Sequence, residues 1–173
     1  MIVRLDASEM RLVSLIAALW VANNASLRVK RYHGQTAFGY DDHIVGLIGE
    51  LALAKASNQF WNGSIGNLRA KDVGRLQVRA TTRPGGCLLL HPTDADDDQH
   101  FLVIVNDAVA DIKGFILGRD GKARRYWRDN DPVHGIRAAY FVPQGVLEPV
   151  PDEWCVRVMR LGCGASNGAH AHA

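Results

Sequence analysis

The sequence predicts an α/β protein in which a mixed β-sheet is flanked by helices. Two N-terminal stretches, about 6–27 and 41–58, carry apolar residues at helical spacing. Residues 76–81 then alternate between apolar and polar side chains, which is the period of a strand with one buried face. Short apolar runs separated by turn residues follow. This order of helices and then strands indicates one α/β sandwich.

The composition is that of one globular domain. The chain has 173 residues, of which 47% are hydrophobic and 22% are charged, so it is long enough to bury a core. The net charge of +2 is too small to indicate a nucleic-acid partner, which has to be argued from local clusters. The three cysteines match no zinc or redox spacing, which favours a reduced, cytosolic protein. We expect one domain over 1–163 and a disordered tail over 164–173.

The stretch 6–27 is expected to form an amphipathic helix that packs on the domain. Ser8 is in position to cap it. The same apolar run has some features of a signal peptide, but Asp6 and Glu9 interrupt the basic region and the run is too short to span a bilayer. No membrane association is expected. The residues predicted to form the buried stripe are Leu12, Leu15, Ile16 and Leu19.

A second helix is expected from about Asp41 to Asn58, after a connecting loop over 28–40. At 100° per residue, Glu50 falls on the flank of the buried stripe, about 60° from Leu47. Its carboxylate is therefore partly shielded, yet it can point along the edge of a sheet. By position alone, Glu50 is either a ligand or an ordinary boundary glutamate in a salt bridge. The predicted buried stripe consists of Ile44, Leu47, Ile48, Leu51 and Ala52.

Short strands and turns account for the rest of the chain. The central strand, Leu76–Thr81, is expected to end at the turn 83–86, where Pro84 is followed by two glycines. Short connections favour antiparallel hairpins in the middle of the sheet. The other expected elements are strands over 87–91, 101–106, 111–118 and 139–142 and a short helix or turn over 122–129.

An acidic loop lies between two of these strands and contains Asp94, Asp96, Asp97 and Asp98. It lacks the glycine and the terminal glutamate of a calcium-binding loop, which favours a solvated turn over a metal site. Two histidines, His91 and His100, flank the loop. Because no second histidine or cysteine lies at ligand spacing, we interpret both as structural or surface residues.

The residues with chemical potential gather around the strand Leu76–Thr81. Glu50 lies on the preceding helix, Asp72 at the entry to the strand, and Gln77 and Arg79 on its polar face. An acid on a helix, an acid before a strand and then a polar-x-basic pair resemble the PD-(D/E)XK nuclease superfamily, in the variant form Asp-x4-Gln-x-Arg. The chain is more closely similar to small phage- or prophage-encoded members. The motifs that carry this similarity are Gly49-Glu50-Leu51-Ala52, the strand Gln77 to Thr81 and Tyr140-Phe141-Val142-Pro143.

The resemblance covers residues 40–150 and implies a restriction-endonuclease-like αβββαβ core with a divalent cation at its centre. Phosphodiester hydrolysis requires neutralised phosphate charge and a nucleophilic water, and a hard cation held by oxygen ligands provides both. Mg²⁺ or Mn²⁺ suits such a set, and the absence of Cys or His ligands disfavours zinc. The expected ligands are the carboxylates of Glu50 and Asp72, the amide oxygen of Gln77 and the main-chain carbonyl of Val78.

Arg79 departs from the superfamily pattern, which has lysine at this position. Arginine stays protonated, so it does not act as a base. It is still able to clamp a phosphate oxygen and offset charge in the transition state. The alternative is that Gln77 and Arg79 only form cross-strand pairs on a solvated strand face.

Nucleic-acid contacts are expected from basic clusters around this strand. The densest cluster, residues 119–128, combines five cations with Tyr126 and Trp127, which suits phosphate binding and base stacking. It is equally compatible with a charged turn whose two aromatic residues pack into the core. The cations expected to contact nucleic acid are Arg69, Lys71, Arg83, Lys122, Arg124, Arg125 and Arg128.

Two hypotheses follow. The first is a Mg²⁺-dependent nuclease acting on DNA, cytoplasmic in a bacterial or phage-infected cell, with a homodimer as one possible state. The second is a nuclease-fold protein without turnover that binds nucleic acid or a protein partner, which the variant residues Gln77 and Arg79 keep open.

Overall fold

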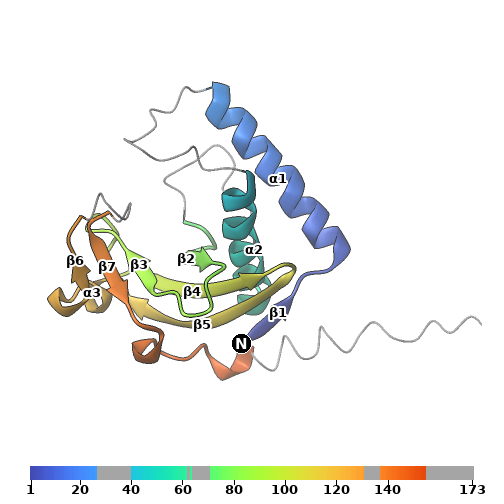
Figure 1. Ribbon diagram of the computed structural model, residues 1–173. Helices are drawn as coiled ribbons and strands as arrows, with labels where there is room; N and C mark the ends of the chain where they lie inside the picture. The colour runs from blue at the N-terminus through green and yellow to red at the C-terminus, as the bar shows by residue number, and fades with distance from the viewer. Residues whose placement is uncertain (27–39, 62, 64–70, 131–136, 155–173) are drawn as a thin grey trace, which may run out of the picture.

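The fold is a bent four-stranded sheet between a pair of helices and a second, smaller sheet (Figure 1). The structure is a computed structural model that describes residues 1–26, 40–61, 63, 71–130 and 137–154. In chain order, its elements are β1 (Ile2–Arg4), α1 (Ala7–Ser26), α2 (Tyr40–Ser57), β2 (Leu76–Thr81), β3 (Leu88–Leu90), β4 (Gln99–Asn106), β5 (Val109–Leu117), α3 (Gly118–Gly121), β6 (Trp127–Arg128) and β7 (Ala139–Val142), with 3-10 turns at Arg124–Tyr126 and Gln144–Val146.

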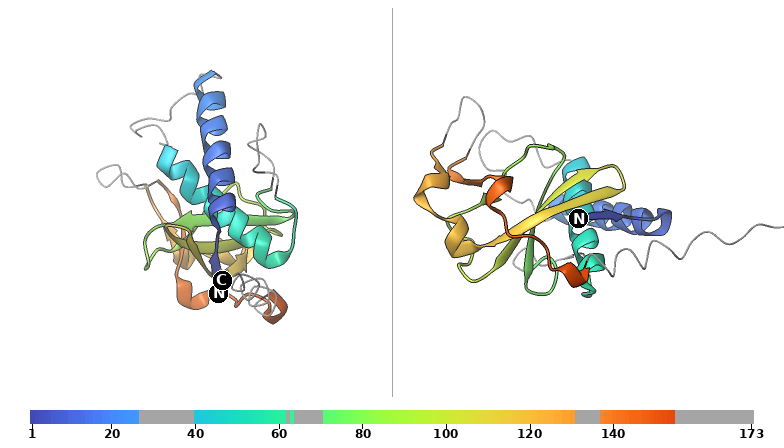
Figure 2. Two further views of the ribbon diagram at one scale, coloured as in Figure 1. Left: turned by 90° about the vertical axis from the view of Figure 1, so that its right-hand side faces the viewer. Right: turned by 90° about the horizontal axis from the view of Figure 1, so that it is seen from below.

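The larger sheet has the strand order β1-β5-β4-β2 and mixed orientation. Strands β4 and β5 form an antiparallel hairpin, β1 pairs antiparallel with β5, and β2 runs parallel to β4. Helix α2 packs on one face of this sheet and α1 packs against α2 (Figure 2). The predicted α/β class with a mixed sheet is therefore confirmed.

The smaller sheet was not predicted and has the strand order β3-β7-β6, all antiparallel. It covers the face of the larger sheet opposite α2. Its apolar side chains Leu88, Leu90 and Val142 share a buried core with Leu102, Ile104 and Ile116 of β4 and β5. The expectation of a single central sheet was wrong because β3 pairs with β7 and not with β2. Strands β1 and β6 are too short for an alternating pattern to reveal them.

Helix α1 begins with a capping box that differs from the expected Ser8 cap. Asp6 Oδ1 accepts hydrogen bonds from the backbone N–H groups of Ser8 and Glu9, at 2.7 and 2.9 Å. Glu9 Oε2 in turn accepts one from the N–H of Asp6, at 2.7 Å. The two acidic residues thus satisfy the free donors of the first helical turn.

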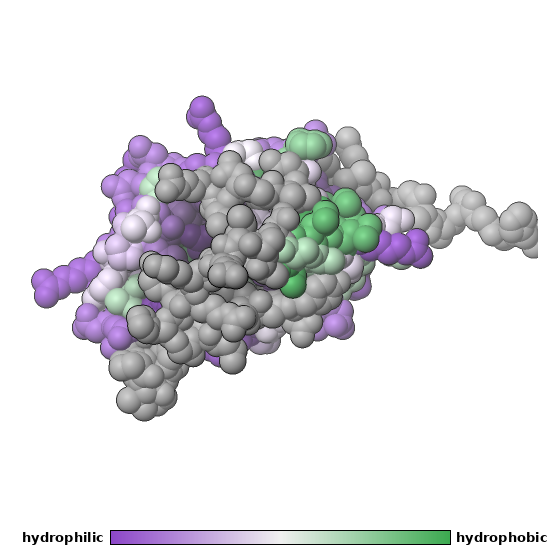
Figure 3. All heavy atoms as spheres, turned by 90° about the horizontal axis from the view of Figure 1, so that it is seen from above, coloured by the Kyte–Doolittle hydropathy of each residue, from purple (hydrophilic) through white to green (hydrophobic). Residues whose placement is uncertain are grey.

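The apolar stripe predicted for α1 is mostly exposed. Leu12, Leu15 and Leu19 are 46%, 65% and 50% exposed, and of the predicted stripe only Ile16 is buried, together with Val13 and Ala17. The helix contacts chiefly α2, so only a narrow face is covered. Figure 3 shows apolar side chains gathered on the side of the molecule where α1 lies. No helix in the described part of the chain has both the length and the apolar character needed to cross a bilayer.

The second helix matches its prediction. Leu47, Ile48 and Ala52 are buried against the sheet, with Ile44 and Leu51 packed beside them. Of the loop expected over 28–40, Tyr40 instead begins α2, and residues 28–39 lie outside the described residues, as does the expected tail over 164–173.

Candidate active site

Glu50 is held beside the start of β2 by the close approach of α2 to the sheet. A Cβ atom on Gly49 would lie 2.8 Å from Cβ of Ala80 and 3.1 Å from Cγ1 of Val78, so only glycine allows the helix this near. Glu50 is partly buried, and its Oε2 accepts a hydrogen bond of 3.0 Å from Nε1 of Trp61. Sequence periodicity located Glu50 but not its indole partner.

Asp72 precedes β2, at the strand entry that the sequence predicted, and its side chain reaches the open edge of that strand. Its Oδ2 accepts a hydrogen bond of 2.6 Å from the backbone N–H of Val78. That N–H points away from the partner strand β4, so Asp72 satisfies a donor at the edge of the sheet. A tight turn follows Asp72, with Gly74 at φ +58° and the side chain of Gln59 packed against it.

The two carboxylates are close enough to repel each other. Burial, reinforced by the nearby charge of Asp72, raises the pKa of Glu50 to about 8, against a smaller opposing effect of the Trp61 hydrogen bond. Burial also raises the pKa of Asp72, although the Val78 hydrogen bond and the charge of Arg79 oppose this shift. Each carboxylate has one oxygen bonded to a protein donor, and no described residue donates to the other oxygen. A proton or a cation is what such a pair lacks.

Each of the three side-chain nitrogens of Arg79 donates to a protein acceptor. Its Nη2 donates to both carboxylate oxygens of Asp94 at 3.0 Å, its Nε to the carbonyl of Leu89 at 3.1 Å, and its Nη1 to the carbonyl of Val78 at 3.1 Å. These bonds tie β2, in the larger sheet, to β3 and to the loop that follows it. The Val78 carbonyl, predicted as a cation ligand, thus already accepts one bond.

The acidic loop pairs with cations and is not simply a solvated turn. Each of its four aspartates forms an ion pair with a different basic side chain. Two of the predicted nucleic-acid contacts, Lys71 and Lys122, are among these partners. Their positive charge is therefore partly offset. The pairs are Asp94–Arg79, Asp96–Lys122, Asp97–Arg119 and Asp98–Lys71.

Gln77 lies next to His100, its register partner on β4. By the alternation of β2, the side chain of Gln77 shares the sheet face of Arg79, and Leu76 and Val78 occupy the other face. His100 is 1% exposed, and neither ring nitrogen makes a hydrogen bond within the described residues. Burial and the neighbouring Arg79 charge lower the pKa of this histidine, against smaller opposing effects of Asp94, Ala95 and Asp98. The sequence did not predict that His100 is buried beside the site.

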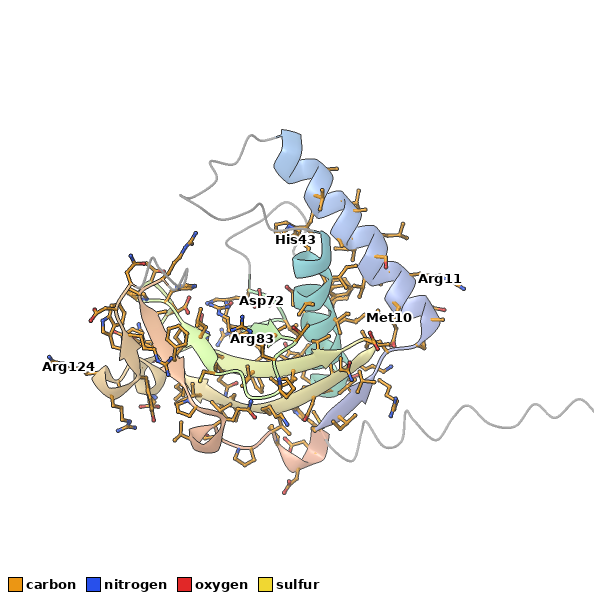
Figure 4. The ribbon with its side chains drawn as sticks, in the orientation of Figure 1. Met10, Arg11, His43, Asp72, Arg83 and Arg124 are labelled. Atoms are coloured by element: carbon orange, nitrogen blue, oxygen red, sulfur yellow. The ribbon has the colours of Figure 1, made fainter. Side chains whose placement is uncertain are left out.

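The basic cluster 119–128 places one of its two aromatic residues in the core and leaves its arginines exposed. Tyr126 is buried in the core beneath the smaller sheet, as expected for a charged turn. Its four arginines remain exposed: Arg119 pairs with Asp97, and two others lie over aromatic rings, Arg125 over Tyr126 at 4.7 Å and Arg128 over Phe141 at 4.8 Å. In Figure 4, Arg124 lies at the outer edge of the molecule, whereas Asp72 and Arg83 lie in its middle. Arg69 is outside the described residues.

Among the described residues, no three His, Cys, Asp or Glu side chains are grouped to hold a metal ion. The carboxylates of the site are two, Glu50 and Asp72, and the other predicted ligands are amide and carbonyl oxygens. No protein-family model matches the sequence, and no curated protein or solved structure is significantly similar to the chain.

Proposed function

We propose that the protein hydrolyses phosphodiester bonds of nucleic acid, DNA being the favoured substrate, with Mg²⁺ or Mn²⁺ at Glu50 and Asp72. The observation that carries this proposal is a pair of partly buried carboxylates: burial and the charge of Asp72 raise the pKa of Glu50, and burial raises the pKa of Asp72. Such repulsion costs stability in the free protein, which is a common feature of catalytic sites. The PD-(D/E)XK resemblance points to the same two residues.

The oxygen donors fit a hard divalent cation. Glu50 and Asp72 each keep one carboxylate oxygen without a described donor. Gln77, predicted as a third ligand, lies on the face of β2 away from α2, because Val78 and Ala80 meet the helix, and it is not assigned to the cation. A bound Mg²⁺ would neutralise phosphate charge and favour ionisation of a water molecule. With only two carboxylates, the free protein should bind the cation weakly. The scissile phosphate is then expected to strengthen its binding.

The protein side chains have separable roles in this proposal. Trp61 and the Val78 N–H fix one oxygen of each carboxylate, which reduces the reorganisation needed on binding. Arg83 is exposed in the turn after β2 and is available to contact a phosphate. Arg79 is assigned a smaller share of phosphate binding than the sequence suggested, because its donors already bind Asp94, Leu89 and Val78.

The engagement of Arg79 supports a second candidate function, a nuclease-fold protein that binds nucleic acid without turnover. In that case Arg79 binds both carboxylate oxygens of Asp94 and connects the two sheets. The guanidinium charge of Arg79 would then not contact a scissile phosphate. The exposed arginines Arg124, Arg125 and Arg128 would then supply the affinity. Both functions predict nucleic-acid binding, and only the first predicts cleavage.

An assay of cleavage separates the two functions. The full chain is incubated with supercoiled, linear and single-stranded DNA and with RNA, each with Mg²⁺, Mn²⁺ or EDTA. The nuclease proposal predicts cleavage with the cations and none with EDTA. It also predicts loss of cleavage in Asp72→Asn, which keeps an oxygen for the Val78 N–H. Asp107→Asn is the matched control, because this exposed turn residue has φ +51°, a conformation that asparagine tolerates. DNA binding without cleavage in all conditions would support the second function.

A further inference from the structure

The turn after α2 brings an indole N–H to the candidate active site. Helix α2 ends at Ser57, and Asn58 adopts the left-handed conformation with φ +57°. The N–H of Gln59 donates to the carbonyl of Ala54 at 3.0 Å, the bond that defines a Schellman motif. This motif reverses the chain, so that Trp61 lies back along the helix and reaches Glu50.

The same turn is fixed to the segment that carries Asp72. The Gln59 side chain packs against Gly74, where a Cβ atom would lie 1.9 Å from Oε1 of Gln59. The Trp61 ring also packs against the core that α2 forms with the larger sheet. Trp61 and Asp72 are therefore held by one packed unit, and the two carboxylates cannot move independently of it.

We propose that Trp61 is a positioning residue that holds the Glu50 carboxylate in the orientation needed to share a divalent cation with Asp72. This inference rests on the proposed function. The indole donor binds one oxygen, which fixes the rotation of the carboxylate and leaves Oε1 for the cation. Without the donor, Glu50 keeps its carboxyl group and its place on α2 but loses its fixed orientation. Donors of this kind, one bond removed from a metal, typically contribute tenfold to a hundredfold to metal affinity.

The first test is the Mn²⁺ affinity of the full chain, measured by calorimetry for the wild type, Trp61→Phe and Trp20→Phe. Phenylalanine retains most of the ring packing and removes only the donor. Trp20 is the matched control because its Nε1 donates a bond of the same length, 3.0 Å, to the carbonyl of Gly63 and not to Glu50. We expect Trp61→Phe to weaken Mn²⁺ binding on the order of tenfold, and Trp20→Phe to leave it unchanged. Equal affinities of Trp61→Phe and the wild type would overturn the inference.

The second measurement does not depend on a metal. The Trp61 indole N–H gives its own signal in a ¹H–¹⁵N spectrum, and replacement of its acceptor should move that signal. We expect Glu50→Ala to shift the Trp61 signal strongly and the Trp20 signal little. If the wild type binds no Mn²⁺, the proposed function fails. The spectrum then still tests whether Trp61 donates a hydrogen bond to Glu50. An unmoved Trp61 signal would then overturn the positioning role.

Discussion

The carboxylate of Asp94 binds the guanidinium of Arg79 through both of its oxygens, each 3.0 Å from Nη2. Asp94 Oδ2 also accepts a hydrogen bond of 2.9 Å from the backbone N–H of His91. The pair is largely buried, with the two side chains 26% and 15% exposed. The pair joins β2, at the edge of the larger sheet, to the loop between β3 and β4. Arg79 therefore has a structural role in addition to any catalytic one.

Removal of the Arg79 side chain should therefore destabilise the fold. We expect Arg79→Ala to lower the free energy of unfolding by about 2–3 kcal/mol, because it removes charge-assisted bonds and leaves Asp94 without its cation. Arg79→Lys should recover only part of this loss, since an ammonium group does not reproduce the fork. Urea unfolding of both variants measures the effect. Unchanged stability in Arg79→Ala would mean that the guanidinium is free to serve a phosphate.

The stability of the protein should fall as the pH rises from about 4.5 to 8 through the contribution of Glu50. Because the folded pKa is raised to about 8 from an ordinary value of 4.5, the folded state retains a proton that the unfolded state has lost in this window. The slope is at most about 1.4 kcal/mol per pH unit. Glu50→Gln should remove it, so the variant gains stability over the wild type as the pH rises. The difference in unfolding free energy between the two, measured at pH 5 and pH 8, should be larger at pH 8. An equal difference at both values would show that Glu50 ionises normally.

His100 should contribute the opposite slope on the acid side. Its pKa is lowered in the folded state, so below about pH 6.5 the unfolded chain takes up a proton more readily and stability is lost as the pH falls. His100→Leu removes a buried ring without a described hydrogen-bond partner and should flatten this loss. At pH 7.5 the variant should be as stable as the wild type or more stable. A marked loss of stability in His100→Leu at pH 7.5 would indicate that the ring has a stabilising partner, either the nearby Ala95 backbone or a group outside the described residues.

Two glycines in α2 should respond to alanine in opposite directions. A Cβ atom on Gly46 meets no atom within 4 Å, so Gly46→Ala should raise stability by about 0.5–1 kcal/mol through helix propensity. A Cβ atom on Gly49 would lie 2.8 Å from Cβ of Ala80, so Gly49→Ala should push α2 away from β2 and destabilise the protein. Thermal unfolding of the two variants tests the helix–strand distance on which the position of Glu50 depends. Similar melting temperatures would contradict it.

The sequence predicted those parts of the site that local periodicity encodes. The alternation of Leu76, Val78 and Ala80 defined β2, and the helical stripe of α2 placed Glu50 on its flank. Contacts between segments that no pattern links were missed, such as Trp61 with Glu50 and Asp94 with Arg79. A signal for the first was present in Asn58, a residue suited to end a helix and reverse the chain.

The wrong prediction for α1 has a related cause. An apolar stripe shows which face of a helix is able to pack, but the partner decides which face does. In α1 the buried face contains Val13 and Ala17, and Leu12, the residue before Val13, is exposed. The assignment of β3 to a second sheet likewise depends on pairing between segments far apart in the chain. Ile16 is the member of the predicted stripe that is buried as expected. Neither the choice of buried face nor the sheet of β3 is encoded in local spacing.

The most direct test of the account is Mn²⁺ binding at pH 8 by the wild type and by Glu50→Gln and Asp72→Asn, measured by titration calorimetry. If the two carboxylates form one cation site, the wild type binds one ion and each variant loses at least about tenfold in affinity. The double variant should then be little worse than either single one. The Asp107→Asn control should bind as the wild type does. A wild type that binds no Mn²⁺, or variants that bind it equally well, would contradict the central claim that Glu50 and Asp72 form one cation site.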